Sequence, residues 1–153
     1  MTSRITDFRA HLSACRGVLV DSNVLLDIAT NDPNWNDWSR RALAECAEHA
    51  TLVINPIVYA EVSIRYTTIE ALDAALPAAL YRREPLPWEA GFLAGKCFLL
   101  YSRRGGPRNS PLPDFYVGAH AAIEHFALLT RDAARYRDYF PKVEILAPTN
   151  RGT

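Results

Sequence analysis

The 153-residue chain has no net charge, because its 17 lysines and arginines are balanced by 17 aspartates and glutamates. A protein without an overall positive field does not attract nucleic acid over long distances. Any binding of a polyanion must therefore depend on a local basic patch or on a bound metal ion.

The sequence also lacks cysteine pairs and long apolar runs. Its three cysteines, Cys15, Cys46 and Cys97, are widely spaced and form no Cys-x-x-Cys motif. This pattern argues against a disulfide framework and a zinc site, and it predicts reduced, buried thiols. No segment resembles a signal peptide or a membrane span. We therefore expect a cytoplasmic protein with no membrane partner.

The chain has the length and the apolar content of one folded domain. Hydrophobic residues make up 49% of it, and it contains no internal repeat or low-complexity tract. This content is sufficient for a full core and argues against general disorder. We expect a single domain over residues 1–153, with an N-terminal helical extension at 1–16 and a frayed tail at 148–153.

Short apolar runs alternate with helical patterns along the chain. The runs predict strands at residues 18–20, 51–54, 127–130 and 143–146. The helical patterns cover residues 4–16, 24–28, 35–50, 56–66, 67–77, 88–102, 113–125 and 133–139. This alternation predicts an α/β fold with a parallel sheet that is covered by helices on both faces.

Two acidic residues follow predicted strands. Asp21 ends the first strand, and Asp132 comes shortly after the third. Ligands of open parallel sheets bind outside the carboxyl ends of the strands, so both acids are placed for a site there. Each has an ordinary alternative role, because Asp21 or Ser22 can cap the next helix, and Asp132 can cap the helix at 133–139.

Two more acids project from apolar helix faces. Glu61 has apolar residues three and four positions away, and a carboxylate buried there needs a partner, a proton or a cation. Asp114 begins an apolar stripe that contains Gly118. The alternatives are a buried ion pair of Glu61 with Arg65 and a favourable interaction of Asp114 with the helix dipole.

Right-handed crossovers can bring these four acids to one edge of the sheet. Converging carboxylates repel each other unless a divalent cation neutralises them, and ligation by oxygen alone favours Mg²⁺ or Mn²⁺. Histidine offers no alternative, since His120 and His125 do not share a helical face. The sequence therefore predicts an acidic site for a hard metal ion.

The stretch at residues 103–112 contains no acid and three arginines, Arg103, Arg104 and Arg108. One interpretation is that they form a flexible rim that contacts phosphate groups. The other is that the first two complement a helix C-terminus while the third is solvated. The sequence leaves both open.

Four short segments, each with an acid among apolar residues, occur in a distinctive order. They are VDSNV at 20–24, YAEV at 59–62, LPDFYVGAHA at 112–121 and LLTRD at 128–132. Their order and spacing resemble those of PIN-domain ribonucleases, in particular the VapC-type toxin of a type II toxin–antitoxin system. The resemblance covers about residues 17–147, so the stretch before the first strand receives no role from it.

The resemblance implies a three-layer α/β/α PIN-like fold with a central parallel sheet of four or five strands. It implies an acidic tetrad of Asp21, Glu61, Asp114 and Asp132. We expect three of these, Asp21, Asp114 and Asp132, to bind the metal, and Glu61 to orient the attacking water.

Other residues are expected to assist this tetrad. Thr130 is implied as a support for the acids, and Ser22 and Asn23 as residues that orient metal-bound water. The candidate contacts for RNA phosphates are Arg103, Arg104, Arg108 and Arg131.

The activity implied is that of an Mg²⁺-dependent endoribonuclease, with Mn²⁺ as the other candidate ion. Hydrolysis of the RNA phosphodiester would leave a 5′-phosphate and a 3′-hydroxyl. The implied partners are RNA, a cognate antitoxin protein and a second copy in a homodimer. Trp35, Trp38 and Tyr66 are candidates for a partner surface, although they can equally belong to the core.

Two other functions remain open. The first is a catalytically idle PIN-like module that binds RNA or a protein. The second is a phosphatase of the haloacid-dehalogenase kind, whose chemistry also begins with an aspartate after the first strand. Those enzymes need a second aspartate two residues later, where this chain has Asn23.

Overall fold

The computed structural model describes residues 8–106 and 112–149. Five strands form one sheet in the order β3-β2-β1-β4-β5, and every neighbouring pair is parallel. The strands are β1 Val18–Val20, β2 Leu52–Ile54, β3 Tyr81–Arg83, β4 Ala127–Leu129 and β5 Ile145–Leu146. The predicted parallel sheet is confirmed, with five strands.

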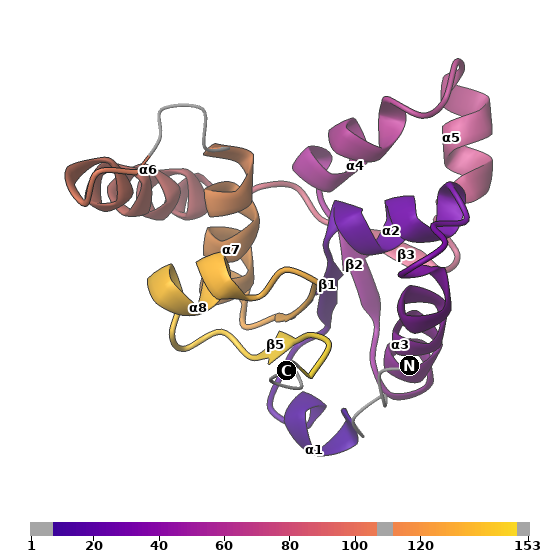
Figure 1. The fold of residues 1–153 in the computed structure, drawn as a ribbon, viewed down its shortest axis with the longest axis horizontal. Helices are drawn as coiled ribbons and strands as arrows, with labels where there is room; N and C mark the ends of the chain where they lie inside the picture. Colours follow the sequence, from indigo (N-terminus) through magenta and orange to yellow (C-terminus); the bar gives the residue numbers. More distant parts are fainter. Residues whose placement is uncertain (1–7, 107–111, 150–153) are drawn as a thin grey trace.

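Helices cover both faces of this sheet. They are α1 Arg9–Leu12, α2 Ser22–Ala29, α3 Asn36–His49, α4 Pro56–Ser63, α5 Ile69–Ala75, α6 Trp88–Arg103, α7 Leu112–Glu124 and α8 Ala134–Tyr139. In Figure 1, α2 and α3 lie on one side of the sheet, and α7 and α8 lie on the other. The predicted three-layer α/β/α architecture is therefore confirmed.

The centre of the core is formed by β1, β2 and β4, in which every residue is apolar and buried. A parallel sheet that is covered on both faces requires such continuous apolar strands, because each side of the strand meets a helix. In the part of the chain that the structure describes, no helix is long and apolar enough to cross a membrane.

The strand β3 has no counterpart among the strands predicted from the sequence. It pairs with β2 at the edge of the sheet, with Arg83 opposite Ile54. Of its three residues only Tyr81 is buried, and both arginines are exposed. An edge strand tolerates charged residues, so its sequence carries no apolar run that would predict it.

The carboxyl ends of β1 and β4 lie side by side. Val20 is the register partner of Leu129, and the backbone N–H of Asp21 donates to the carbonyl oxygen of Leu129 over 2.9 Å. The residues that follow these strands, Asp21 and Thr130, are therefore neighbours in space. The fold in this way creates the edge at which the sequence predicts a site.

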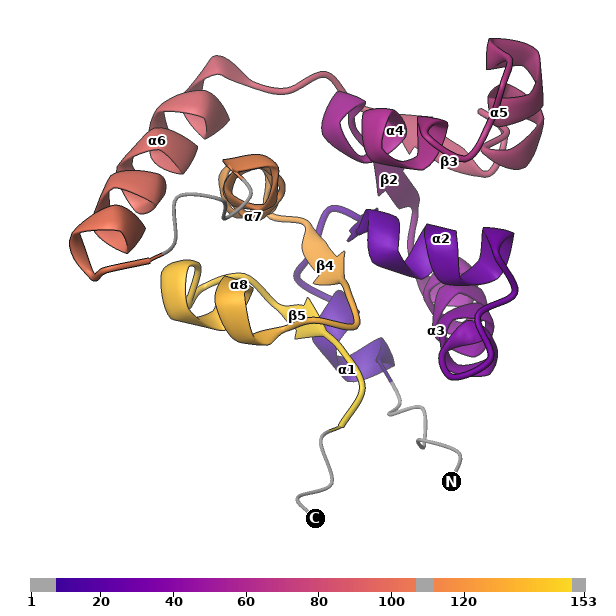
Figure 2. The same cartoon turned by 45° about the horizontal axis from the view of Figure 1, so that its top comes forward.

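The longest helix, α6, lies away from the sheet. Its most extensive packing is against α7, and Figure 2 shows it at the outer side of the molecule, beyond α7. The α7 helix is thus covered on the side that faces away from the sheet. Asp114 lies in the first turn of α7.

Candidate active site

Asp21 lies at the end of β1 and is only 4% exposed. Its Oδ1 atom accepts a hydrogen bond of 2.8 Å from the backbone N–H of Ser22, and Asp21 occupies the N-cap position of α2. Its Oδ2 atom accepts hydrogen bonds of 2.9 Å from the hydroxyl groups of Thr130 and Tyr136. The cap and the candidate site therefore involve the same carboxylate, held by three donors.

The surroundings of Asp21 disfavour its negative charge on balance. Burial raises the pKa of its carboxyl group to about 6, and the negative charge of Asp114 adds to this. The hydrogen bonds from Thr130 and Tyr136 act in the opposite direction, because they stabilise the ionised form. A cation bound here would offset the effects of burial and of the Asp114 charge, and would so stabilise the ionised form of Asp21.

Glu61 projects from α4 toward the same place. Burial, together with the charges of Asp21 and Asp114, raises its pKa to about 7, and the Ser22 side chain acts in the opposite direction. Its Oε1 atom is buried and has no hydrogen-bond partner among the described residues. The alternative pairing with Arg65 is not found in this part of the chain, and Arg65 is exposed.

Asp114 is half-buried in the first turn of α7. Its charge acts on Asp21, on Glu61 and on the hydroxyl group of Tyr136. Three of the four predicted acids, carried by β1, α4 and α7, are therefore close enough to influence one another. The position of Asp114 at a helix N-terminus, which the dipole also favours, is compatible with this arrangement.

Asp132 differs from the other three acids. Its side chain is exposed, and within the described residues its carboxylate takes part in no hydrogen bond or ion pair. Its backbone N–H donates to Thr130 Oγ1 over 3.1 Å. The alternative role of Asp132 as the cap of α8 is wrong, because Ala133 occupies the N-cap position and no side chain makes a capping hydrogen bond there.

The side chains predicted to assist the acids form a connected network. The Thr130 hydroxyl group donates to Asp21 and accepts a hydrogen bond of 3.2 Å from Asn23 Nδ2. Thr130 is fully buried, so its hydroxyl orientation is fixed by these partners. Ser22 contributes its backbone N–H to Asp21, and its side chain lies close enough to Glu61 to lower the pKa of that carboxyl group.

The four predicted arginines have different surroundings. Arg108 lies outside the described residues. Arg103 is in the last turn of α6 and is exposed. Arg104 occupies the C-cap position of this helix, and its guanidinium group lies 5.5 Å from the ring centroid of Tyr139. Arg131 binds the buried carboxylate of Asp27 with two hydrogen bonds of 2.8 and 3.0 Å.

Two residues near the acids, Asp27 and Tyr136, were not predicted from the sequence. Asp27 lies in α2 and is 3% exposed, but the criterion applied to Glu61 does not identify it, because only Val24 among the residues three or four positions away is apolar. Tyr136 carries no signal either, because a tyrosine in a short helix is ordinarily a packing residue. Its hydroxyl group is buried, and its pKa is raised by burial and by the nearby carboxylates.

The donor atoms fit a hard divalent cation, because all of them are oxygens and one of them, Glu61 Oε1, is buried without a hydrogen-bond donor. Within the described part of the chain, three possible ligand atoms lie within 4.8 Å of one another in a different place, on α3. They belong to Glu45, Glu48 and His49. In that group His49 pairs with Glu45 over 3.6 Å. The acids at the sheet edge are more widely spaced, as suits Mg²⁺, which usually retains several water molecules.

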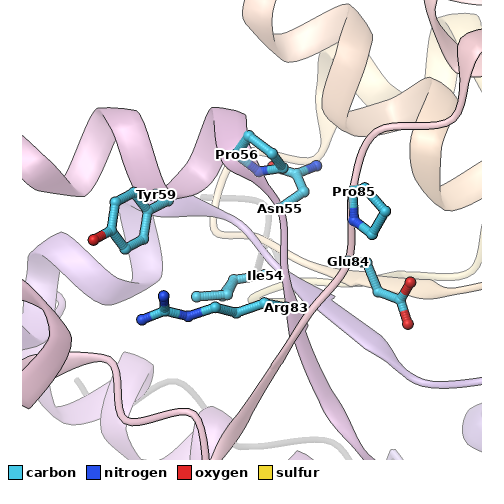
Figure 3. A pocket seen from close by; sticks show the side chains of 7 residues that line it. All are labelled: Ile54, Asn55, Pro56, Tyr59, Arg83, Glu84 and Pro85. Atoms are coloured by element: carbon cyan, nitrogen blue, oxygen red, sulfur yellow. The ribbon is translucent and has the colours of Figure 1, made fainter.

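A cavity of about 250 Å³ lies at the carboxyl ends of β2 and β3. It is lined by Ile54, Asn55, Pro56, Tyr59, Arg83, Glu84 and Pro85. In Figure 3, Glu84 points away from Tyr59 and Arg83. None of the four predicted acids lines this cavity, so it is separate from the acidic site.

Comparison with known proteins identifies the fold. The family model described as PIN domain matches residues 18–140, and no curated protein matches the chain. A chain of VapBC-1 from nontypeable Haemophilus influenzae is 18% identical with a TM-score of 0.66, covering 87% of this chain and 98% of that one.

Two further solved structures have the same fold. A chain of VapBC2 from Rickettsia felis, bound to a fragment of promoter DNA, is 17% identical with a TM-score of 0.64, covering 84% of this chain and 96% of that one. VapC20 from Mycobacterium tuberculosis, described as a sarcin-ricin loop cleaving toxin, is 14% identical with a TM-score of 0.56. That alignment covers 79% of this chain and 94% of the other.

Proposed function

The chain belongs to the PIN-domain family, and from this membership we propose that it is a metal-dependent endoribonuclease that hydrolyses RNA phosphodiester bonds. The observation that carries the proposal is the convergence of Asp21, Glu61 and Asp114 from three separate elements, with a buried Glu61 oxygen that lacks a donor. Such a cluster is unfavourable for stability by itself, which points to a role in binding a cation.

We propose Mg²⁺ as the ion, with Mn²⁺ as the other candidate, held by Asp21, Asp114 and Asp132. When bound, the ion lowers the pKa of a water molecule and neutralises charge on the scissile phosphate. Glu61 is positioned by α4 to accept a hydrogen bond from the attacking water. Hydrolysis would leave a 5′-phosphate and a 3′-hydroxyl.

The remaining residues of the site keep the acids in place. Thr130 and Tyr136 fix Oδ2 of Asp21, while Ser22 fixes Oδ1, so the carboxylate is held before any ligand arrives. Asn23 in turn holds Thr130. This preorganisation supports catalysis, because ligands that are already oriented lose little freedom when they act.

Contact with RNA is proposed for arginines at the exposed end of α6 and in the segment after it. Arg103 and Arg104 are exposed, so both can reach a phosphate. Arg108 remains a proposal on sequence grounds alone. We also propose a cytoplasmic location, where an RNA substrate is available.

We further propose that the protein is the toxin of a toxin–antitoxin pair and that it forms a homodimer. The structural relatives from Rickettsia felis and Haemophilus influenzae are described as VapBC complexes. Large apolar residues on α6 are exposed: the exposed fraction is 93% for Trp88 and 71% for Phe92. Exposed apolar groups of this size favour a protein partner.

The surface first suggested for a partner is less suitable. Trp38 is buried in the core, and Trp35 and Tyr66 are only partly accessible. Partner binding can be tested by measuring the molecular mass in solution for the parent and for Trp88→Ser. Loss of the dimer in the variant is expected, and a monomeric parent would contradict the homodimer.

The experiment that tests the nuclease is RNA cleavage with Mg²⁺, with Mn²⁺ and with EDTA. We expect cleavage only with a divalent ion, and we expect Asp21→Asn to lower the rate by about 100-fold or more, because loss of a residue that merely orients a metal ligand already costs about 10–100-fold. Asp37→Asn is the matched control, since Asp37 is an exposed acid on α3 whose only ion pair among the described residues is a 3.6 Å contact with Arg41.

Three results would contradict or redirect the proposal. Cleavage that persists in EDTA or in Asp21→Asn would exclude the metal mechanism. RNA binding without cleavage would support the idle module instead. The phosphatase is disfavoured, since Asn23 stands where a second aspartate is needed and its amide is bonded to Thr130.

A further inference from the structure

A partly buried ion pair between Arg131 and Asp27 lies directly beside the acidic site. Arg131 Nε and a terminal nitrogen of its guanidinium group bind the two carboxylate oxygens of Asp27 over 2.8 and 3.0 Å. The Ser39 hydroxyl group of α3 donates to Asp27 Oδ2 over 2.8 Å. The Arg131 guanidinium also lies 5.4 Å from the ring centroid of Trp35. Four side chains, from α2, α3, the N-cap position of α3 and the segment after β4, thus meet at one point.

This ion pair is connected to Asp21 through the backbone. Arg131 stands between Thr130, which donates to Asp21, and Asp132, whose N–H donates to Thr130. The backbone N–H of Arg131 also approaches Asn23 Oδ1, over 3.4 Å. Any movement of the Arg131 backbone would therefore displace the residues on both sides of it.

We infer that the Asp27–Arg131 ion pair is a positioning device that fixes residues 130–132 against α2 and α3, and thereby orients Thr130 and Asp132 toward the metal site. The inference rests on the proposed nuclease function. It changes the role of Arg131 from a contact with RNA phosphate to an internal support, and it gives Asp27 a role in the same unit.

The geometry favours support over phosphate binding. A guanidinium group that already holds a carboxylate in two-point contact has its planar edge occupied, and the same edge would be needed for a phosphate. Asp27 is 3% exposed, so its charge depends on this arginine. Releasing Arg131 to bind RNA would leave that carboxylate buried without a counter-charge.

The positioning role and the phosphate-binding role of Arg131 predict different effects of Asp27→Asn on RNA binding. If the pair positions the site, Asp27→Asn and Arg131→Gln should act in the same direction, each lowering Mn²⁺ affinity about 10-fold, as loss of a residue that orients metal ligands typically does. RNA affinity in EDTA should then change little. If Arg131 instead binds phosphate, Asp27→Asn frees it and should tighten RNA binding.

The experiment measures Mn²⁺ binding by calorimetry, RNA binding in EDTA at several salt concentrations, and amide hydrogen exchange at Thr130 and Asp132. We expect both variants to weaken Mn²⁺ binding and to speed exchange at these amides, with an unchanged salt dependence of RNA binding. Arg16→Gln is the matched control, because it breaks an arginine–carboxylate contact of 2.7 Å with Glu124 far from the acids.

Contrary results are equally specific. Unchanged Mn²⁺ affinity and unchanged exchange in both variants would overturn the positioning role. So would weaker RNA binding in Arg131→Gln with a salt slope reduced by about one, since that is the signature of a lost phosphate contact.

Two milder variants keep the test valid if the buried substitutions prevent folding. Ser39→Ala removes one donor to Asp27 without changing charge, and Arg131→Lys keeps the charge but loses the two-point contact. Faster exchange at Asp132 is expected in both, and parent-like exchange in both would overturn the inference. Hydrogen exchange needs neither metal nor RNA, so failure of the nuclease proposal is distinguishable from failure of this one.

Discussion

Two hydroxyl groups donate to Oδ2 of Asp21, and one of them belongs to Tyr136. Tyr136 is 3% exposed and donates to Asp21 Oδ2 over 2.9 Å. Tyr136→Phe removes this donor, and hydrogen bonds to charged groups contribute about 1.5–3 kcal/mol. We expect the free energy of unfolding to fall by an amount in this range at pH 8, where Asp21 is ionised, and by less at pH 5, below its pKa of about 6.

Denaturant titrations at the two pH values test this expectation. Tyr139→Phe is the control, since Tyr139 lies in the same helix and packs its ring 5.3 Å from Phe115. Equal losses for Tyr136→Phe at pH 5 and pH 8 would show that its hydroxyl group does not stabilise the ionised carboxylate.

At the scale of single residues, the sequence identified the acids better than their supports. Glu61 stood out because a charged group on an apolar helix face is costly, and Asp21 because it ends a buried strand. The partners of Asp21 were only partly foreseen: Thr130 was expected, Tyr136 was not. A hydrogen bond between residues 115 positions apart depends on how α8 docks, which no local pattern records.

At the scale of elements, the contact between α7 and α8 depends on a glycine. A Cβ atom on Gly118 would lie 2.2 Å from the ring of Phe140, far inside van der Waals contact. Gly118→Ala should therefore lower the free energy of unfolding by about 1–3 kcal/mol, the usual cost of overpacking. Thermal unfolding measures this effect.

Gly95→Ala in α6 provides the opposite case. A Cβ atom there meets nothing within 4 Å, so the substitution should stabilise the helix by about 0.5–1 kcal/mol. If Gly118→Ala is as stable as Gly95→Ala, then Phe140 does not pack against Gly118 as described.

Elements with strong patterns were predicted from the sequence, and weak ones were not. The central strands β1, β2 and β4 are continuous apolar runs and were located within one residue at each end. β3 was missed because an edge strand of one tyrosine and two arginines has no such run. The predicted helix at 4–16 is reduced to α1 within the described residues.

At the scale of the whole molecule, a neutral chain contains a concentrated negative site. Some of the basic residues that balance the total charge pair with acids elsewhere, for example Arg82 with Glu84 over 2.7 Å. The parallel topology explains the concentration, because it brings the carboxyl ends of β1 and β4 to one edge. The parallel arrangement followed from the alternation of strands and helices, whereas the order of the strands was not predicted, and the distances between the acids depend on side-chain packing that the sequence does not specify.

This concentration makes the stability of the metal-free protein depend on pH. Asp21 and Glu61 have pKa values of about 6 and about 7 in the folded state, above their ordinary values of 3.8 and 4.5. The unfolded chain therefore releases these protons at lower pH than the folded chain does. With respect to these groups, the metal-free protein should be most stable below their ordinary pKa values of 3.8 and 4.5, and it should lose stability as the pH rises from there to about 7.

A divalent cation should reverse this loss, because it binds the ionised carboxylates of the folded state only. Addition of Mn²⁺ at 100 times its dissociation constant should raise the free energy of unfolding by about 2.7 kcal/mol at pH 8. At pH 5 the gain should be smaller, since protons compete for the same oxygens. Denaturant titrations with and without Mn²⁺ measure both quantities. Asp21→Asn should reduce the pH dependence and the Mn²⁺ effect together; if it removes neither, Asp21 does not contribute to a cation site and the charge concentrated at this edge has another cause.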